Sequence, residues 1–296
     1  MQLSPLWFAA WSTGLSVACK LQLHGCFLQR GLIKQAAVEK AVRRIESHVQ
    51  TSISEEEKDD LAINDRSFGG DALRESPDIY SLVQDSSLIP FVQQFFEKRI
   101  CSLGSASVRV LPRFPAQGRK VVSPYHLDNI ADRTIGGGMT TFAALIAIYL
   151  TDVQERPWRG NTVLYPPSHV LMSDKFRKHN WDAIYKLNGT YHRPDDLLTQ
   201  EIQLQAHAGD VLLLHPLLLH GVAPNLGRET RHAVFLHLYF EDMLPPEHGG
   251  PPANDSSRLQ VVQKLWHGWN MSLVQEPERA WGQVAAHSIL PEYPES

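Results

Sequence analysis

The sequence predicts a mainly β protein with flanking helices, in which the strands form a sandwich or a closed barrel. From Ala106 onward the spacing of apolar residues changes from about 3.6 to 2, and short β-favouring stretches alternate with turn residues. Most of these stretches have no helical pattern between them, which argues against a βαβ fold. Of the 296 residues, 43% are hydrophobic and 20% charged, which excludes disordered, collagen-like and coiled-coil chains.

Two amphipathic helices are predicted before the strands. Residues Lys34–Val49 place apolar side chains at spacings of three and four, with charged residues between them. A second helix is expected at Ser87–Ile100, because an apolar stripe runs along it and Pro90 falls in its first turn. The polar stretch 51–80 between them predicts a solvated, mobile loop.

The predicted strands after Ala106 are separated by Pro- and Gly-containing turns. The first includes Val108, Val110 and Phe114. The further ones are Thr141–Thr151, Thr162–Tyr165, Glu201–Gln205, Val211–Leu214 and Arg231–Glu241. We expect one domain over residues 1–296. Its parts are an N-terminal helical support and lid region (1–105), a β core (106–241) and a C-terminal extension (242–296). The core carries an insertion at 168–200, with helical character over Ser168–Leu187.

Charge and cysteine content narrow the function classes. A net charge of −4 and a pI near 6.4 give no global basic field, so nucleic acid is not the expected partner. Three cysteines form neither a disulfide framework nor a zinc-finger spacing, which turns attention to the 14 histidines. Residues 1–19 are a poor signal peptide without a basic start. We expect a soluble protein, cytoplasmic or organellar and without a membrane span, that acts on a small molecule.

One group of residues has the spacing of a metal centre. In His126-Leu127-Asp128 the imidazole and the carboxylate point to the same side of an extended segment, so both can meet one cation. Chance yields about one such triplet in a chain of this composition, so the triplet needs its context. His220 follows 94 residues later and Arg231 eleven residues after that. Two histidines and one carboxylate leave positions open on a non-haem Fe(II) for a chelating cosubstrate and O2, and the fork of an arginine suits a carboxylate.

The order of these motifs resembles the phytanoyl-CoA dioxygenase family of Fe(II)- and 2-oxoglutarate-dependent oxygenases. The resemblance covers about residues 21–241 and includes Leu23–Phe27 as an opening strand, Gly160–His169 as a turn, and Gly209-Asp210 before the strand that leads to His220. It implies a double-stranded β-helix, or jelly roll. The chain departs from the family pattern at Pro167, at Val222 and in the long insertion before Gln200, which puts the shape of the substrate in doubt.

The resemblance also implies site residues. Iron would be held by His126, Asp128 and His220, and the distal carboxylate of 2-oxoglutarate by Arg231, with Thr162 offering a hydroxyl to the same carboxylate. Related halogenases lack the carboxylate ligand, so Asp128 favours hydroxylation or desaturation of a C–H bond, with O2 consumed and succinate and CO2 released.

Alternatives remain at several positions. His215 is a second candidate for the ligand assigned to His220, but it precedes Pro216 and has no arginine at the matching distance. Arg228 is the fallback carboxylate binder. Four further residues lie near the motifs and fit either a site or simple packing: Tyr125, Asn129, His169 and His237. Residues 51–80 and 170–200 are candidate lids.

Two other functions compete with an oxygenase. Two histidines and a carboxylate also bind zinc, so a zinc-dependent hydrolase or isomerase is one rival. A catalytically silent ligand-binding relative is the other. Arg231 and the order of the motifs weigh against the first, and the complete His126, Asp128 and His220 set weighs against the second.

Overall fold

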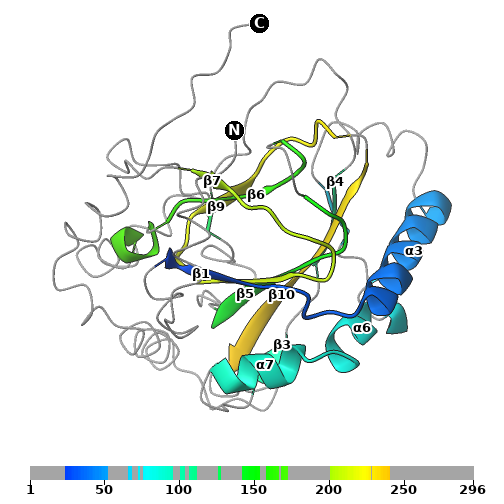
Figure 1. Ribbon diagram of the computed structural model, residues 1–296, viewed down its shortest axis with the longest axis horizontal. Coiled ribbons are helices and arrows are strands. Elements are labelled where there is room, and N and C mark those ends of the chain that lie inside the picture. The colour runs from blue at the N-terminus through cyan, green and yellow to red at the C-terminus, as the bar shows by residue number, and fades with distance from the viewer. Residues whose placement is uncertain are drawn as a thin grey trace, which may run out of the picture.

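The computed structural model describes residues 24–52, 66–68, 73, 76–95, 101–103, 107–111, 126–127, 142–153, 158–166, 168–172, 201–227 and 229–240. Two antiparallel sheets face each other (Figure 1). The larger sheet has the spatial order β1 (Cys26–Gln29), β8 (Val211–Leu214), β5 (Ala144–Tyr149), β10 (Arg231–Phe240), β4 (Ser107–Leu111) and β2 (Arg66–Phe68), and β3 (Cys101–Leu103) also pairs with β10. The smaller sheet has the order β7 (Ile202–Gln203), β6 (Thr162–Leu164) and β9 (His220–Val222).

The chain passes back and forth between the two sheets. From β4 in the larger sheet it reaches His126, which bridges to His220 of β9, and it then returns to β5. β6 and β7 lie in the smaller sheet, β8 in the larger, β9 in the smaller and β10 in the larger. This alternation is the winding of a double-stranded β-helix, so the predicted mainly β jelly roll is confirmed.

Both faces of the larger sheet are covered, as β5 shows most clearly. Every residue of this strand is buried. Leu145, Ala147 and Tyr149 point to the interior between the sheets, where they pack with apolar residues of β1, β6 and β8. Ile146 and Ile148 belong to the apolar layer shared with the helices. A strand buried on both faces reads as a continuous apolar run, which is the pattern of this segment.

Three helices lie along the outer side of the larger sheet (Figure 1): α3 (Gln35–Ser52), α6 (Pro77–Gln84) and α7 (Leu88–Phe95). The buried stripe of α3, with Val38, Ala41 and Ile45, follows the predicted helical spacing. α6 packs against α3, and Arg44 Nε donates a hydrogen bond to Ser76 Oγ at 3.3 Å just before α6 begins. In the residues that the structure describes, no helix has the length and apolar character needed to cross a membrane.

Two expectations for the first hundred residues were wrong. The described parts of 51–80 are not simply a solvated loop, because β2 joins the larger sheet, Leu73 is fully buried and α6 starts at Pro77. Strands do not begin at Ala106 either, since β1, β2 and β3 precede it. Of these, β1 overlaps the opening strand Leu23–Phe27 that the family resemblance implies. β2 and β3 have three residues each, too few to display a period of two, and no motif marks them.

Smaller differences concern element ends and one missed strand. The second predicted helix ends at Phe95, and the chain enters β3 at Cys101. β9 was not predicted, because its three residues include Gly221 and directly follow the apolar residues Leu217–Leu219. Residues 168–172 are helical, as expected for the start of the insertion. The rest of the insertion to residue 200, and the extension 242–296, lie outside the described residues, and the division of the chain into parts stays a prediction.

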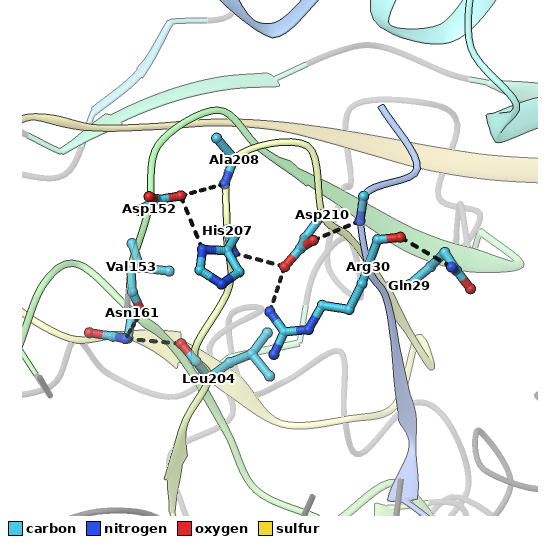
Figure 2. Close-up of polar contacts among 10 residues, drawn as sticks. Gln29, Arg30, Asp152, Val153, Asn161, Leu204, His207, Ala208 and Asp210 are labelled. Atoms are coloured by element: carbon cyan, nitrogen blue, oxygen red, sulfur yellow. Dashed lines mark hydrogen bonds and ion pairs between the residues drawn. The ribbon is translucent and has the colours of Figure 1, made fainter. Parts of the chain in front are cut away.

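A buried carboxylate ties the first strand to the turn before β8 (Figure 2). Asp210 accepts hydrogen bonds from the Arg30 guanidinium at 2.6 Å, from Gly31 N at 2.8 Å and from His207 N at 2.8 Å. Gly209, directly before it, has φ +89°, and a Cβ there would lie 2.6 Å from the Ile33 carbonyl oxygen. The Gly209-Asp210 motif is therefore a structural clamp: the glycine permits the turn, and the carboxylate satisfies three donors.

Asp210→Asn is expected to lower the free energy of unfolding by about 2–4 kcal/mol, because the amide replaces one acceptor oxygen by a donor that faces other donors. Chemical denaturation followed by circular dichroism measures this change. Asp152→Asn is the matched control: Asp152 accepts a hydrogen bond from Ala208 N at 2.8 Å, but its side chain is 61% exposed (Figure 2). The control should lose less than about 1 kcal/mol. Equal losses in the two variants would contradict the clamp.

Candidate functional site

His126 and His220 are brought together across the edge of the smaller sheet. Their backbones pair in an antiparallel bridge, with His126 N donating to His220 O at 3.0 Å and His220 N donating to His126 O at 3.3 Å. Their ring centres lie 4.5 Å apart, and the rings are tilted by 53°. The two histidines singled out by their spacing from Asp128 and Arg231 are thus neighbours in the fold.

The backbone fixes the tautomer of His220. Its Nδ1 lies 3.0 Å from Leu218 O, and since a carbonyl oxygen only accepts, Nδ1 carries the proton. In a neutral ring this leaves the lone pair on Nε2, the arrangement common in metal-binding histidines. Ser168 Oγ accepts a hydrogen bond from Leu219 N at 2.9 Å, which holds the residue just before His220. Both contacts orient the ring of His220.

The distance between the two rings allows them to share a metal ion. Two imidazoles on one ion, each with a nitrogen about 2.1 Å from it, have ring centres about 4.5–5.3 Å apart, the shorter distance at right-angled and the longer at tetrahedral positions. The observed separation of 4.5 Å lies at the short end of this range. Within the described ranges, no three His, Cys, Asp or Glu side chains come together. Asp128, the expected carboxylate ligand, lies outside the described residues.

His215, the alternative to His220, is placed differently. Its ring lies against that of His169, with ring centres 5.1 Å apart. Its Nδ1 accepts a hydrogen bond from Leu217 N at 3.0 Å. Burial, and then the neighbouring His169, lower the pKa of His215 well below its usual value, so the ring is neutral. The structure therefore pairs His126 with His220, and His215 with His169.

Arg231 lies deep between the two sheets and is 2% exposed. It opens β10 in the larger sheet, and its Nη2 donates a hydrogen bond at 3.4 Å to Oγ1 of Thr162, the first residue of β6 in the smaller sheet. Its guanidinium carbon lies 5.7 Å from the ring centre of Tyr149 and 5.5 Å from that of Phe235. The expected carboxylate-binding residues, Arg231 and Thr162, thus meet across the sandwich.

The remaining candidates are placed as follows. His237 stacks on Phe142, with ring centres 4.4 Å apart and planes within 13° of each other. His169 packs with His215. Tyr125, Asn129 and Arg228 lie outside the described residues.

Two residues that contact the site were missed as contributors. The apolar pattern predicts Tyr149 only as part of a strand, and the motif Gly160–His169 predicts Ser168 only as part of a turn. No local spacing connects Tyr149 to Thr162 or Ser168 to Leu219, since these contacts join separate elements.

The residue after Arg231 gives the fold a pH dependence. His232 is buried, and burial followed by the charge of Arg231 lowers its pKa from 6.5 to about 4. The unfolded chain takes up this proton as the pH falls below about 6.5, whereas the folded chain resists it until about pH 4. Stability is therefore lost through this window. The loss through His232 is expected to reach about 2 kcal/mol at pH 5 relative to pH 7.

Denaturation curves at pH 7, 6 and 5 measure this loss, and His232→Leu should show a shallower pH dependence by that amount. An unchanged slope in the variant would assign the acid sensitivity to other groups, of which buried His215 is the first to examine.

A protein-family model matches most of the chain. The model of the phytanoyl-CoA dioxygenase (PhyH) family matches residues 21–233, a span that contains His126, Asp128, Thr162, His220 and Arg231. A comparison with curated protein sequences gives no match.

Solved structures with a similar fold include three enzymes. The epimerase SnoN, in complex with Fe3+, alpha ketoglutarate and nogalamycin RO, has a TM-score of 0.55 and 16% identity over 83% of this chain and 91% of its own. The alpha ketoglutarate dependent carbocyclase SnoK from nogalamycin biosynthesis has a TM-score of 0.53 and 16% identity, over 77% and 85%. HygX from Streptomyces hygroscopicus, with nickel and 2-oxoglutarate bound, has a TM-score of 0.51 and 17% identity, over 76% and 87%. At these identities the likeness is one of fold.

Proposed function

Because the chain belongs to the phytanoyl-CoA dioxygenase family, we propose that it is an Fe(II)- and 2-oxoglutarate-dependent dioxygenase that hydroxylates or desaturates a C–H bond of a small organic molecule. One observation carries the proposal. The paired rings of His126 and His220 suit a metal ion, and buried Arg231 beside Thr162 suits a carboxylate, in one sandwich. An enzyme that binds a metal-chelating oxoacid needs both.

In this proposal His126, Asp128 and His220 hold the iron. Bound iron, with 2-oxoglutarate and O2, supplies oxidation of a C–H bond, while 2-oxoglutarate is converted to succinate and CO2. His220 presents Nε2 as a ligand, because its Nδ1–H donates a hydrogen bond to Leu218 O. Ser168 Oγ accepts a hydrogen bond from Leu219 N and so holds the backbone directly before His220.

Arg231 and Thr162 bind the distal carboxylate of the cosubstrate. The guanidinium supplies a fixed positive charge in a place where burial removes competing water, so its interaction with a carboxylate is stronger than at the surface. Thr162 adds a hydroxyl from the opposite sheet. Because the two groups come from different sheets, they fix the orientation of the bound cosubstrate as well as its affinity.

The structural neighbours support this assignment of cofactors and substrate class. SnoN holds Fe3+, alpha ketoglutarate and a natural-product ligand, and HygX holds nickel and 2-oxoglutarate. By analogy, we infer that the substrate of this chain is a small molecule.

The test has two stages. Anaerobic addition of 2-oxoglutarate to the Fe(II)-loaded protein should produce a visible absorption band, because the oxoacid chelates the metal. Succinate release is then measured with acyl thioesters, amino-acid-like solutes and secondary metabolites as substrates. Asp128→Ala and Arg231→Ala should each abolish it. Full turnover by Asp128→Ala would overturn the iron assignment, and tight zinc binding with no response to 2-oxoglutarate would favour a hydrolase or isomerase.

A further inference from the structure

Tyr149 lies against the two residues proposed to bind the cosubstrate carboxylate. It ends β5, it is fully buried, and its side chain points into the space between the sheets. Its phenol oxygen lies 2.6 Å from Thr162 Oγ1, and its ring faces the Arg231 guanidinium at 5.7 Å. Tyr149 comes from the larger sheet and Thr162 from the smaller one, so this short hydrogen bond joins the two sheets at the site.

The direction of that hydrogen bond decides what Thr162 can offer a ligand. A threonine hydroxyl has one proton to donate and two lone pairs that accept. Arg231 Nη2 uses one lone pair, because a guanidinium only donates. If Tyr149 donates to the second lone pair, both lone pairs are occupied, and the Thr162 proton remains available to a ligand. If Thr162 donates to Tyr149 instead, its proton is already used in a hydrogen bond within the protein and is not available to a ligand.

We propose that Tyr149 is a positioning residue that donates its phenol proton to Thr162, so that the Thr162 hydroxyl in turn donates to the distal carboxylate of the cosubstrate. This inference rests on the proposed function. A carboxylate accepts and cannot donate, so Thr162 contributes to its binding only when the Thr162 proton is directed toward it. Hydrogen bonds in such a chain also strengthen one another.

The ionisation of Tyr149 supports its role as a donor. Burial raises its pKa above the usual value of 10, and the opposing effects of the Arg231 charge and of hydrogen bonds with Thr162 and Arg231 are smaller. Tyr149 therefore keeps its proton over the whole physiological pH range. The nearby positive charge does not turn it into a phenolate, which would accept the Thr162 proton and reverse the chain.

Binding of two oxoacids separates a positioning role from a structural one. The probes are 2-oxoglutarate and 2-oxopentanoate, which has the same chain length with a methyl group in place of the distal carboxylate. Both are titrated anaerobically into the Fe(II)-loaded full-length protein by calorimetry. Tyr149→Phe should weaken 2-oxoglutarate by about 3- to 10-fold, the value of one hydrogen bond, and leave 2-oxopentanoate unchanged.

A double-mutant cycle tests whether Tyr149 acts through Thr162. Thr162→Val should weaken 2-oxoglutarate at least as much as Tyr149→Phe, and the double variant should bind no more weakly than Thr162→Val alone. Tyr165→Phe is the matched control, because this buried phenol donates instead to Glu201 Oε2 at 3.3 Å. It should leave the binding of both oxoacids unchanged, and thermal unfolding verifies that every variant is folded.

The outcomes separate this inference from the proposed function. A wild-type protein that binds neither oxoacid, or both equally well, overturns the proposed function and this inference with it. If the wild type prefers 2-oxoglutarate, three results in the variants would overturn this inference alone. The first is a Tyr149→Phe variant that binds 2-oxoglutarate as tightly as the wild type, and the second is a Tyr149→Phe variant that binds both oxoacids more weakly by the same factor. The third is a full additional loss of affinity when Tyr149→Phe is added to Thr162→Val.

Discussion

Replacing Arg231 with leucine is expected to weaken the binding of 2-oxoglutarate at least about 100-fold, the largest single effect on cosubstrate affinity that the structure indicates. Arg231 is 2% exposed and lies at the junction of the two sheets, so bulk water does not replace its charge. The KM for 2-oxoglutarate in succinate formation should rise in parallel with the dissociation constant. Arg231→Lys, which keeps the charge but not the planar fork, should fall between the wild type and Arg231→Leu.

The same substitution should leave the ligand-free fold intact. Leucine keeps the position apolar and fills part of the space of the buried arginine, and replacing a buried charge by an apolar side chain is often neutral or stabilising. We therefore expect an equal or higher Tm for ligand-free Arg231→Leu, while the increase in Tm caused by 2-oxoglutarate disappears. Near-wild-type affinity for 2-oxoglutarate in a folded Arg231→Leu protein would exclude Arg231 as the carboxylate binder.

His220→Ala is expected to remove the metal ion. Sites with four protein ligands bind zinc with about 10–16 kcal/mol, so one ligand contributes about 3 kcal/mol, and its loss lowers metal affinity at least about 100-fold. Metal content after dialysis should fall from about one ion per chain to nearly none. Succinate formation should fall with it, since the oxoacid is held by the metal.

His215 provides the matched comparison. It is as deeply buried as His220 and lies five residues earlier, but its ring contacts His169 and not His126. His215→Asn is expected to change the stability of the fold while keeping the metal. The opposite result, metal retained in His220→Ala and lost in His215→Asn, would exchange the roles of the two histidines.

The long-range order of the fold could be predicted better than its short elements. The helix α3 is long enough to display its apolar stripe, and β8 and β10 are bounded by turn residues, so their patterns are local. β2, β3 and β9 have three residues each, and they are strands because of the partners they meet. A pattern within one segment carries no information about such partners.

The same distinction applies to the site. His126, His220 and Arg231 could be identified because their spacing along the chain resembles a known order of motifs. Tyr149 could not, since a tyrosine that ends an apolar strand has the same sequence signature whether its hydroxyl meets water, a backbone carbonyl or a threonine on the facing sheet. Its contact with Thr162 depends on how the two sheets close, which only the folded chain reveals.

The alternation of the chain between the two sheets also governs how the site comes into being. His126 and His220 are 94 residues apart, and Arg231 meets Thr162 across 69 residues. Contacts between residues so far apart in the sequence form slowly, because the entropic cost of closing a long loop comes before the contacts can stabilise it. We therefore expect the proposed metal centre and carboxylate site to be completed late in folding. A metal ion or cosubstrate would bind weakly to a partly folded chain in which these residues are still apart. We therefore expect such a ligand to slow unfolding and to have little effect on the rate of folding.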